Sequence, residues 1–119
     1  MTNVTDRLVD AYYENWGRGD FDRLRDILSD DFRFRGALDR ADGPDAFIAL
    51  IKQNAPSFGQ VAFSDIRRIV DGDRAVNLYD FHAGPVSVPM AEAFEVRADR
   101  ISRIDLYFDP ARFRPADGG

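Results

Sequence analysis

Residues 61–109 form one run in which apolar and polar residues alternate over most of its length: VAFSDIRRIVDGDRAVNLYDFHAGPVSVPMAEAFEVRADRISRIDLYFD. Alternation with a period of two is typical of strands that bury one face. Residues that favour turns interrupt the run at Asp71-Gly72-Asp73, Gly84-Pro85 and Asp99-Arg100. We therefore predict a meander of antiparallel strands, at about 61–70, 74–83, 87–98 and 101–109.

Helical patterns occupy the residues before this run. Behind Thr5, an expected N-cap, apolar residues recur at helical spacing until a pair of nearby glycines ends the helix. A short second helix is predicted over Phe21–Leu28. A third helix begins at Pro44, which suits a first helical position because its missing N–H costs nothing there, and should end near Pro56.

The segments around these helices are shorter. Ser29-Asp30-Asp31 is expected to be a break between the second helix and the next strand. Apolar and charged residues alternate strictly over Phe32–Arg35, as they do in a short half-buried strand. Gly36–Gly43 is polar and is predicted to be a loop. The tail, Pro110–Gly119, is expected to fray.

This order of elements predicts the α+β class, with three N-terminal helices packed on one side of a long, mostly antiparallel sheet. Strands of about ten residues twist and curl. A curled sheet covered by helices leaves a concave apolar space at its open end, which is the usual place for a ligand in a small domain. The 119 residues suffice for a single domain, 1–119, with its own core.

Composition excludes several functions. The chain has 21 acidic and 16 basic residues and a net charge of −5, so neither nucleic acid nor an anionic membrane is an expected partner. The absence of cysteine excludes thiol chemistry and cysteine-based metal sites. The chain shows neither a signal-peptide pattern nor an apolar run of the ~20 residues that cross a bilayer, so we expect a soluble, cytoplasmic protein.

One acid interrupts an apolar strand face. Glu92 shares its face with Val88, Met90, Phe94 and Val96. A carboxyl group held there loses hydration, so its pKa rises, and it becomes a neutral hydrogen-bond donor or a strong base near pH 7. In the alternative, Glu92 pairs with an arginine or reaches solvent at the rim of the sheet.

The single histidine, His82, shares a strand face with Asp80, Leu78 and Val76. A carboxylate near an imidazole raises the imidazole pKa and fixes its tautomer, which suits a general acid or base. In the alternative, the strand twists into water and exposes both groups. With one histidine a two-histidine metal site is impossible, and phosphate loops, nucleophile elbows and calcium loops are absent, so we expect no metal.

The register of the second hairpin decides whether these groups meet. With an even register, Asp80 and His82 face the same side as Met90 and Glu92, within reach of one ligand. A one-residue shift places them on opposite faces. Spacing alone leaves both registers open.

Four strings that span nearly the whole chain are YYENWGRGDFD (12–22), LSDDF (28–32), GPDAF (43–47) and LYFDP (106–110). Together with the order of elements, they resemble the nuclear transport factor 2-like superfamily, in particular its ketosteroid isomerase and polyketide cyclase (SnoaL-like) branches. The resemblance implies a cone of three helices and a strongly curved sheet around one deep pocket. It also implies a homodimer formed through the outer face of the sheet.

The resemblance further implies site residues. Tyr12 falls where the isomerase branch has a tyrosine donor, and Glu92 falls where it has a second oxyanion donor, a carboxylic acid kept neutral. The catalytic base of that branch falls at or near Gly36, so either Asp39 or the Asp80–His82 pair has to replace it. The residues implied to line the cavity and contact the substrate are Trp16, Phe34, Val76, Leu78, Met90, Phe94, Ile104, Leu106 and Phe108.

We therefore expect an isomerase, cyclase or related lyase that needs no cofactor and acts on a mostly apolar small molecule containing a carbonyl group. The Asp80–His82 pair, or Asp39, would remove a proton alpha to the carbonyl, while Tyr12 and protonated Glu92 stabilise the oxyanion. Epoxide hydrolases of the superfamily use an Asp-Arg-Asp arrangement, and we expect no arginine on the inner faces of the strands.

The alternative is a domain of the same fold without catalytic activity. It would bind an apolar ligand, or associate with a protein through a broad apolar outer sheet face around Tyr79, Phe81 and Tyr107. The missing base at Gly36 favours this alternative. Catalysis as expected above requires His82 and Glu92 inside one cavity.

Overall fold

Helices and one curved sheet make up the computed structural model, which describes residues 3–58 and 60–113. The helices are α1 (Val4–Arg18), α2 (Phe21–Asp26), α3 (Pro44–Phe58) and a short 3-10 helix, η1 (Pro110–Phe113). The strands are β1 (Leu28–Arg35), β2 (Arg40–Asp42), β3 (Val61–Asp71), β4 (Arg74–Ala83), β5 (Val86–Arg97) and β6 (Arg100–Tyr107). The predicted α+β class is confirmed.

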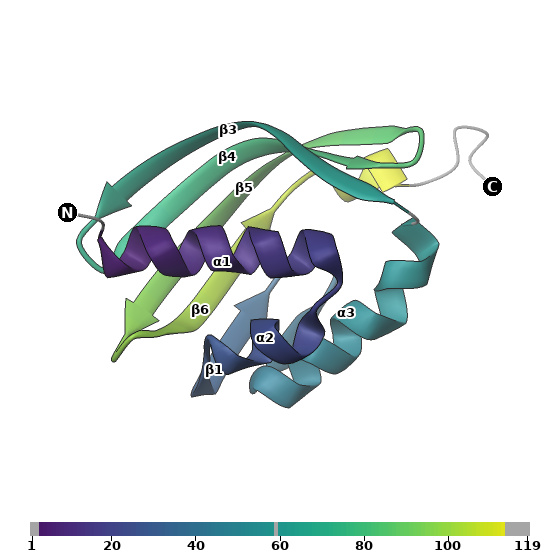
Figure 1. Ribbon diagram of the computed structural model, residues 1–119. Coiled ribbons are helices and arrows are strands. Elements are labelled where there is room, and N and C mark those ends of the chain that lie inside the picture. The colour runs from purple at the N-terminus through teal and green to yellow at the C-terminus, as the bar shows by residue number, and fades with distance from the viewer. Residues whose placement is uncertain (1–2, 59, 114–119) are drawn as a thin grey trace.

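The sheet has the strand order β2-β1-β6-β5-β4-β3. Strands β3 to β6 form the predicted antiparallel meander, and β1 adds to β6 in parallel, which makes the sheet mixed. In Figure 1 the long strands curl over α1, and α2 and α3 lie on the same, concave side. The sheet is curled but not closed, so the space between it and the helices stays open at one end.

Several predicted boundaries are wrong at the N-terminal half. Asn3, not Thr5, caps α1: its side-chain oxygen accepts from the Thr5 backbone N–H at 2.7 Å. The second helix ends at Asp26, because residues 28–35 all belong to β1, including the Ser29-Asp30-Asp31 segment expected to break the chain. The loop predicted over 36–43 contains β2, which pairs with β1. Residues 114–119 of the predicted tail lie outside the described residues.

An irregularity in β3 turns an arginine toward the helices. The register with β4 shifts between Ser64 and Arg67, and Asp65 has a φ of 53°. A bulge of this kind inserts one extra residue, so the residues after it exchange faces. Arg68 therefore points to α1, which corrects the expectation that no arginine lies on an inner strand face.

Arg68 ties α1 to two strands. Its guanidinium donates to the side-chain oxygens of Asp6 at 3.2 Å and Asp10 at 2.8 Å on α1, and to Asn77 Oδ1 at 2.8 Å on β4. Asn77 is fully buried, and its Nδ2 is the only buried side-chain polar atom without a partner in the described ranges. This contact holds the N-terminal half of α1 against the sheet.

None of the helices in residues 3–58 and 60–113 has the length and apolar character needed to span a lipid bilayer.

Candidate active site

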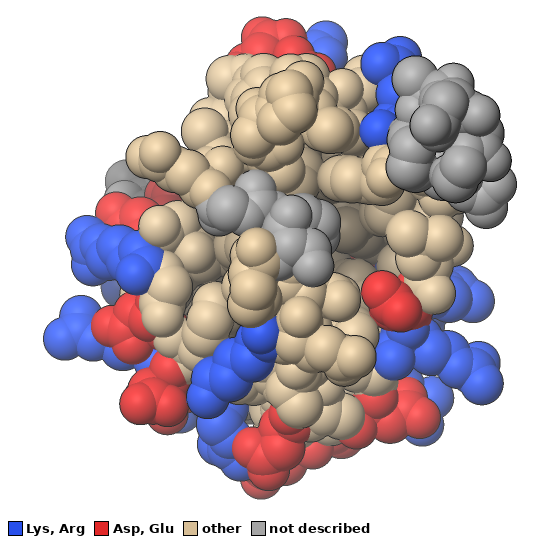
Figure 2. Space-filling model, turned by 90° about the vertical axis from the view of Figure 1, so that its right-hand side faces the viewer, with Lys and Arg blue, Asp and Glu red and all other residues tan. Residues whose placement is uncertain are grey.

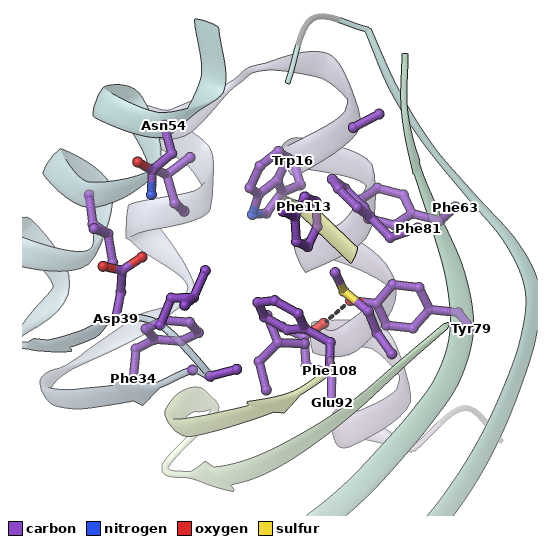
Figure 3. Close-up of a pocket in the computed structure, with 18 of the residues that line it drawn as sticks. Trp16, Phe34, Asp39, Asn54, Phe63, Tyr79, Phe81, Glu92, Phe108 and Phe113 are labelled. Atoms are coloured by element: carbon purple, nitrogen blue, oxygen red, sulfur yellow. Dashed lines mark hydrogen bonds between the residues drawn. The ribbon is translucent and has the colours of Figure 1, made fainter. Parts of the chain in front are cut away.

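A cavity of about 440 Å³ opens between the concave side of the sheet, α1 and α3. This volume falls within the usual range for small-molecule sites, roughly 300 to 1,000 Å³. Figure 3 shows aromatic side chains from both layers converging on the space. The aromatic residues that line it are Tyr12, Tyr13, Trp16, Phe34, Phe47, Phe63, Tyr79, Phe81, Phe108 and Phe113.

Glu92 is the acidic group on the sheet wall of this cavity. It is only 2% exposed, so the predicted inward orientation is confirmed. Its Oε1 accepts hydrogen bonds from Tyr13 at 2.6 Å and from Tyr79 at 2.8 Å. Its Oε2 accepts from Tyr12 at 3.2 Å. Three phenol groups therefore surround one buried carboxyl group.

Burial dominates the electrostatics of this cluster. Loss of hydration raises the pKa of Glu92, and the hydrogen bonds from the tyrosines oppose that rise without reversing it. Burial, followed by the nearby Glu92 charge, raises the pKa values of Tyr12, Tyr13 and Tyr79. Burial therefore shifts the cluster toward a neutral carboxylic acid among neutral phenols.

A second carboxyl group lies at the opening of the cavity. Asp39 is exposed and lines the cavity from the turn between β1 and β2, where its carbonyl oxygen accepts from the Gly36 N–H at 2.7 Å. In Figure 3, Asp39 lies near Phe34, across the cavity from Tyr79. Figure 2 shows the hollowed face of the molecule, where uncharged residues surround the opening and most charged residues lie farther out.

Phe34 explains why position 36 carries no side chain. A Cβ on Gly36 would lie 2.9 Å from Cζ of Phe34, closer than real Cβ atoms approach. The Phe34 ring, which packs against Phe47 with centroids 4.9 Å apart, thus occupies the space that a carboxylate at position 36 would need. Asp39 is the nearest acid along the chain that reaches the cavity.

The expectation that Asp80 and His82 lie in the cavity is wrong. Gly84-Pro85 forms the predicted turn, but a two-residue turn pairs Ala83 with Val86, so the register is odd and His82 lies opposite Ser87. The buried face of β4 therefore carries the odd-numbered residues, and the even-numbered ones lie on the outer face. His82 Nε2 contacts Ser64 Oγ at 2.6 Å and Nδ1 contacts Ser87 Oγ at 2.8 Å, away from Glu92.

The same register corrects further positions. Val76 and Leu78, expected in the cavity, are on the outer face of β4. Tyr79 and Phe81, expected on the outer face, are 5% exposed and line the cavity instead. Tyr107 alone of that group is exposed.

A family model, the SnoaL-like domain, matches residues 9–104. The chain belongs to the SnoaL-like domain family. No curated protein sequence matches it significantly.

Solved structures share the fold of this SnoaL-like domain. An NTF2-like protein of unknown function from Cytophaga hutchinsonii aligns with a TM-score of 0.79 at 15% identity, over 92% of this chain and 94% of that one. A candidate polyketide cyclase from Xanthomonas campestris aligns with a TM-score of 0.78 at 24% identity, over 89% and 90%. An LEH-like epoxide hydrolase from M. tuberculosis aligns with a TM-score of 0.69 at 26% identity, over 89% and 83%.

Most other expected positions of the SnoaL-like domain lie where the resemblance implied. Phe94 and Ile104 point inward but are buried in the core, 1% and 0% exposed, rather than on the cavity surface. Sequence reasoning missed Tyr13 and Tyr79 as partners of Glu92, and a strict reading of the two-residue turn would have found Tyr79. The expected residues that do line the cavity are Tyr12, Trp16, Phe34, Asp39, Met90, Glu92, Leu106 and Phe108.

Proposed function

We propose that this SnoaL-like domain is an acid–base enzyme without a cofactor, which enolises a mostly apolar small molecule that contains a carbonyl group, in an isomerase- or cyclase-type reaction. One observation carries the proposal: a single apolar cavity holds a buried carboxyl group among phenols and an exposed carboxyl group at its opening. Two acids in such different surroundings suit opposite roles in proton transfer.

The two acids divide the reaction between them. Asp39 removes a proton from the carbon alpha to the carbonyl. In an isomerase-type reaction it returns this proton to another atom of the enolate. In a cyclase-type reaction the enolate carbon adds to a second carbonyl carbon of the same molecule, the C=O π bond there breaks, and its oxygen takes the electron pair and then the proton. Tyr12 donates to the carbonyl oxygen and the neutral Glu92 next to it supports this donor, so that the pair stabilises the negative charge that develops there.

The second candidate is an apolar-ligand-binding domain without catalytic activity. Gly36 favours it, because Phe34 fills the space in which the isomerase branch holds its base. The outer face of the sheet offers less apolar surface for association with another protein than the sequence predicted, since Tyr79 and Phe81 are buried.

Solvent hydrogen exchange separates the two candidates. The protein is incubated in D₂O with apolar cyclic ketones, 2-tetralone first, and deuterium at the alpha carbons is measured by mass spectrometry. We expect exchange above the buffer rate, reduced about a hundredfold or more by Asp39→Asn. Asp42→Asn is the matched control, because Asp42 is exposed on β2 and does not line the cavity.

The opposite result is equally informative. Equal exchange by wild type and Asp39→Asn would remove Asp39 from the mechanism. Saturable binding of 2-tetralone without any exchange above the buffer rate would favour the binding domain.

We also propose that the chain forms a homodimer through the outer face of the sheet, as the family resemblance implies. Exposed apolar side chains lie on this outer face on both β3 and β6, among them Ile69 and Tyr107.

A further inference from the structure

The hydrogen bonds around Glu92 restrict where its proton can lie. A neutral carboxyl group has one O–H donor and one carbonyl oxygen, and each tyrosine has one proton to donate. Oε1 already accepts from two phenols, at 2.6 and 2.8 Å, and these fill both of its lone-pair directions. Oε2 has one partner, Tyr12, at the longer distance of 3.2 Å. Oε2 is therefore the oxygen that carries the proton in the neutral acid.

This placement reverses the hydrogen bond to Tyr12. When Oε2–H donates to the Tyr12 oxygen, the proton of Tyr12 no longer points at Glu92 and is free for another acceptor. Tyr12 lines the cavity, where an oxygen of a bound ligand can accept this proton. We propose that Tyr13 and Tyr79 are positioning residues, which keep the Glu92 proton on Oε2 and thereby make the Tyr12 hydroxyl the donor to a ligand oxygen.

Packing holds the phenols in this arrangement. The Tyr13 ring meets the Tyr12 and Tyr79 rings edge to face, with centroids 5.2 and 5.4 Å away, and Tyr12 meets Phe94 in the same way at 5.4 Å. Met90 Sδ, at 3.6 Å from the Tyr79 hydroxyl, is a weaker acceptor than Oε1. The Tyr79 hydroxyl therefore continues to donate to Oε1.

The arrangement defines the chemical class of the ligand. It takes an apolar body that carries one oxygen able to accept a hydrogen bond: a carbonyl, an enolate or a phenol oxygen. This inference deepens the proposed function. Only one part of it rests on that function, namely that the ligand oxygen belongs to the carbonyl group that reacts. Its test therefore uses binding and spectroscopy rather than turnover.

The binding test compares 2-naphthol with naphthalene, which has the same rings without the hydroxyl. Wild type should prefer 2-naphthol, and Tyr12→Phe should lose the preference. Tyr13→Phe should reduce it about tenfold, the effect of one hydrogen bond, because the proton can then move to Oε1 and Tyr12 turns back to Oε2. Naphthalene affinity should not change in either variant, which shows that the cavity is intact.

Glu92→Gln supplies the decisive comparison. An amide has a carbonyl oxygen for Tyr13 and Tyr79 and an N–H₂ group for Tyr12, so it copies the neutral acid in the proposed orientation. It should keep the preference for 2-naphthol. Tyr107→Phe is the matched control for the tyrosine variants, because Tyr107 is 59% exposed on the outer face.

Infrared difference spectra of wild type and Glu92→Gln give a second readout. They should show the carbonyl band of a protonated carboxylic acid in the 2-naphthol complex, and Tyr13→Phe should move it to higher frequency because the carbonyl oxygen of Glu92 then accepts one hydrogen bond instead of two. An ionised Glu92 in that complex, an unchanged preference in Tyr12→Phe, or no binding of 2-naphthol to wild type would each overturn the proposal. Failure of ketone exchange with these results intact would overturn only the proposed function.

Discussion

Glu92 makes the stability of the protein depend on pH. Its folded-state pKa is raised above the ordinary value of 4.5, chiefly by burial, so the native state holds the proton more tightly than the unfolded chain does. The stabilising contribution is complete below pH 4.5 and is lost as the pH rises through the folded-state pKa. Above that pH, the native state has to hold a buried carboxylate that only phenols stabilise.

We predict that Glu92→Gln removes this dependence. The free energy of unfolding of wild type should fall relative to that of the variant as the pH rises above about 4.5, since the amide has no proton to lose. Urea unfolding at a series of pH values measures the difference. Glu95→Gln serves as the control, because Glu95 is on the other face of the same strand. Parallel pH profiles for wild type and Glu92→Gln would contradict the prediction.

At the level of elements, the alternation of apolar and polar residues predicts neither the inner face of β4 nor the bulge in β3. The positions of the four meander strands, β3 to β6, were predictable because period-two patterns and turn residues bound them closely. The inner face of β4 was not chosen correctly, since both of its faces carry apolar residues and only the length of the Gly84-Pro85 turn distinguishes them. The bulge near Asp65 has no comparable signal, because its positive φ is a product of the folded sheet.

The bulge has an energetic consequence, because it brings Arg68 to α1. Replacing Arg68 by Met removes the partners of Asp6 and Asp10 and leaves fully buried Asn77 without its hydrogen bond. We expect a loss of about 1.5 to 3 kcal/mol in the free energy of unfolding, mostly from the unpaired amide, because the ion pairs are partly exposed. Urea unfolding measures it.

The neighbouring arginine provides the control for this element. Arg67 precedes Arg68 in the same strand, faces outward and is exposed. Arg67→Met should change the free energy of unfolding by less than about 0.5 kcal/mol. Equal losses in the two variants would show that the bulge does not distinguish the two side chains energetically.

At the scale of the whole molecule, the cavity depends on groups that are far apart in the sequence. Tyr12 and Glu92 are 80 residues apart, and the family resemblance was enough to pair them. Tyr13 and Tyr79 join them only because the sheet curls over α1, which brings β4 and β5 against the same helix turn (Figure 1). Asp39 lies at the opening because of the direction of the turn between β1 and β2, which the pattern of apolar and polar residues does not predict.

The outer face of the same sheet gives the last prediction. Ile69 and Tyr107 are 66% and 59% exposed, and an apolar side chain at a homodimer interface loses that contact with water. In sedimentation equilibrium, the proposed dimer should dissociate at least about thirtyfold more readily in Ile69→Asp, because each buried, unpaired carboxylate costs about 2 kcal/mol or more and the dimer holds one from each protomer. Leu38→Asp, at the cavity opening, should leave the association unchanged. A wild-type chain that stays monomeric across a dilution series would exclude the dimer, and weakening by Leu38→Asp but not by Ile69→Asp would place the interface at the cavity instead.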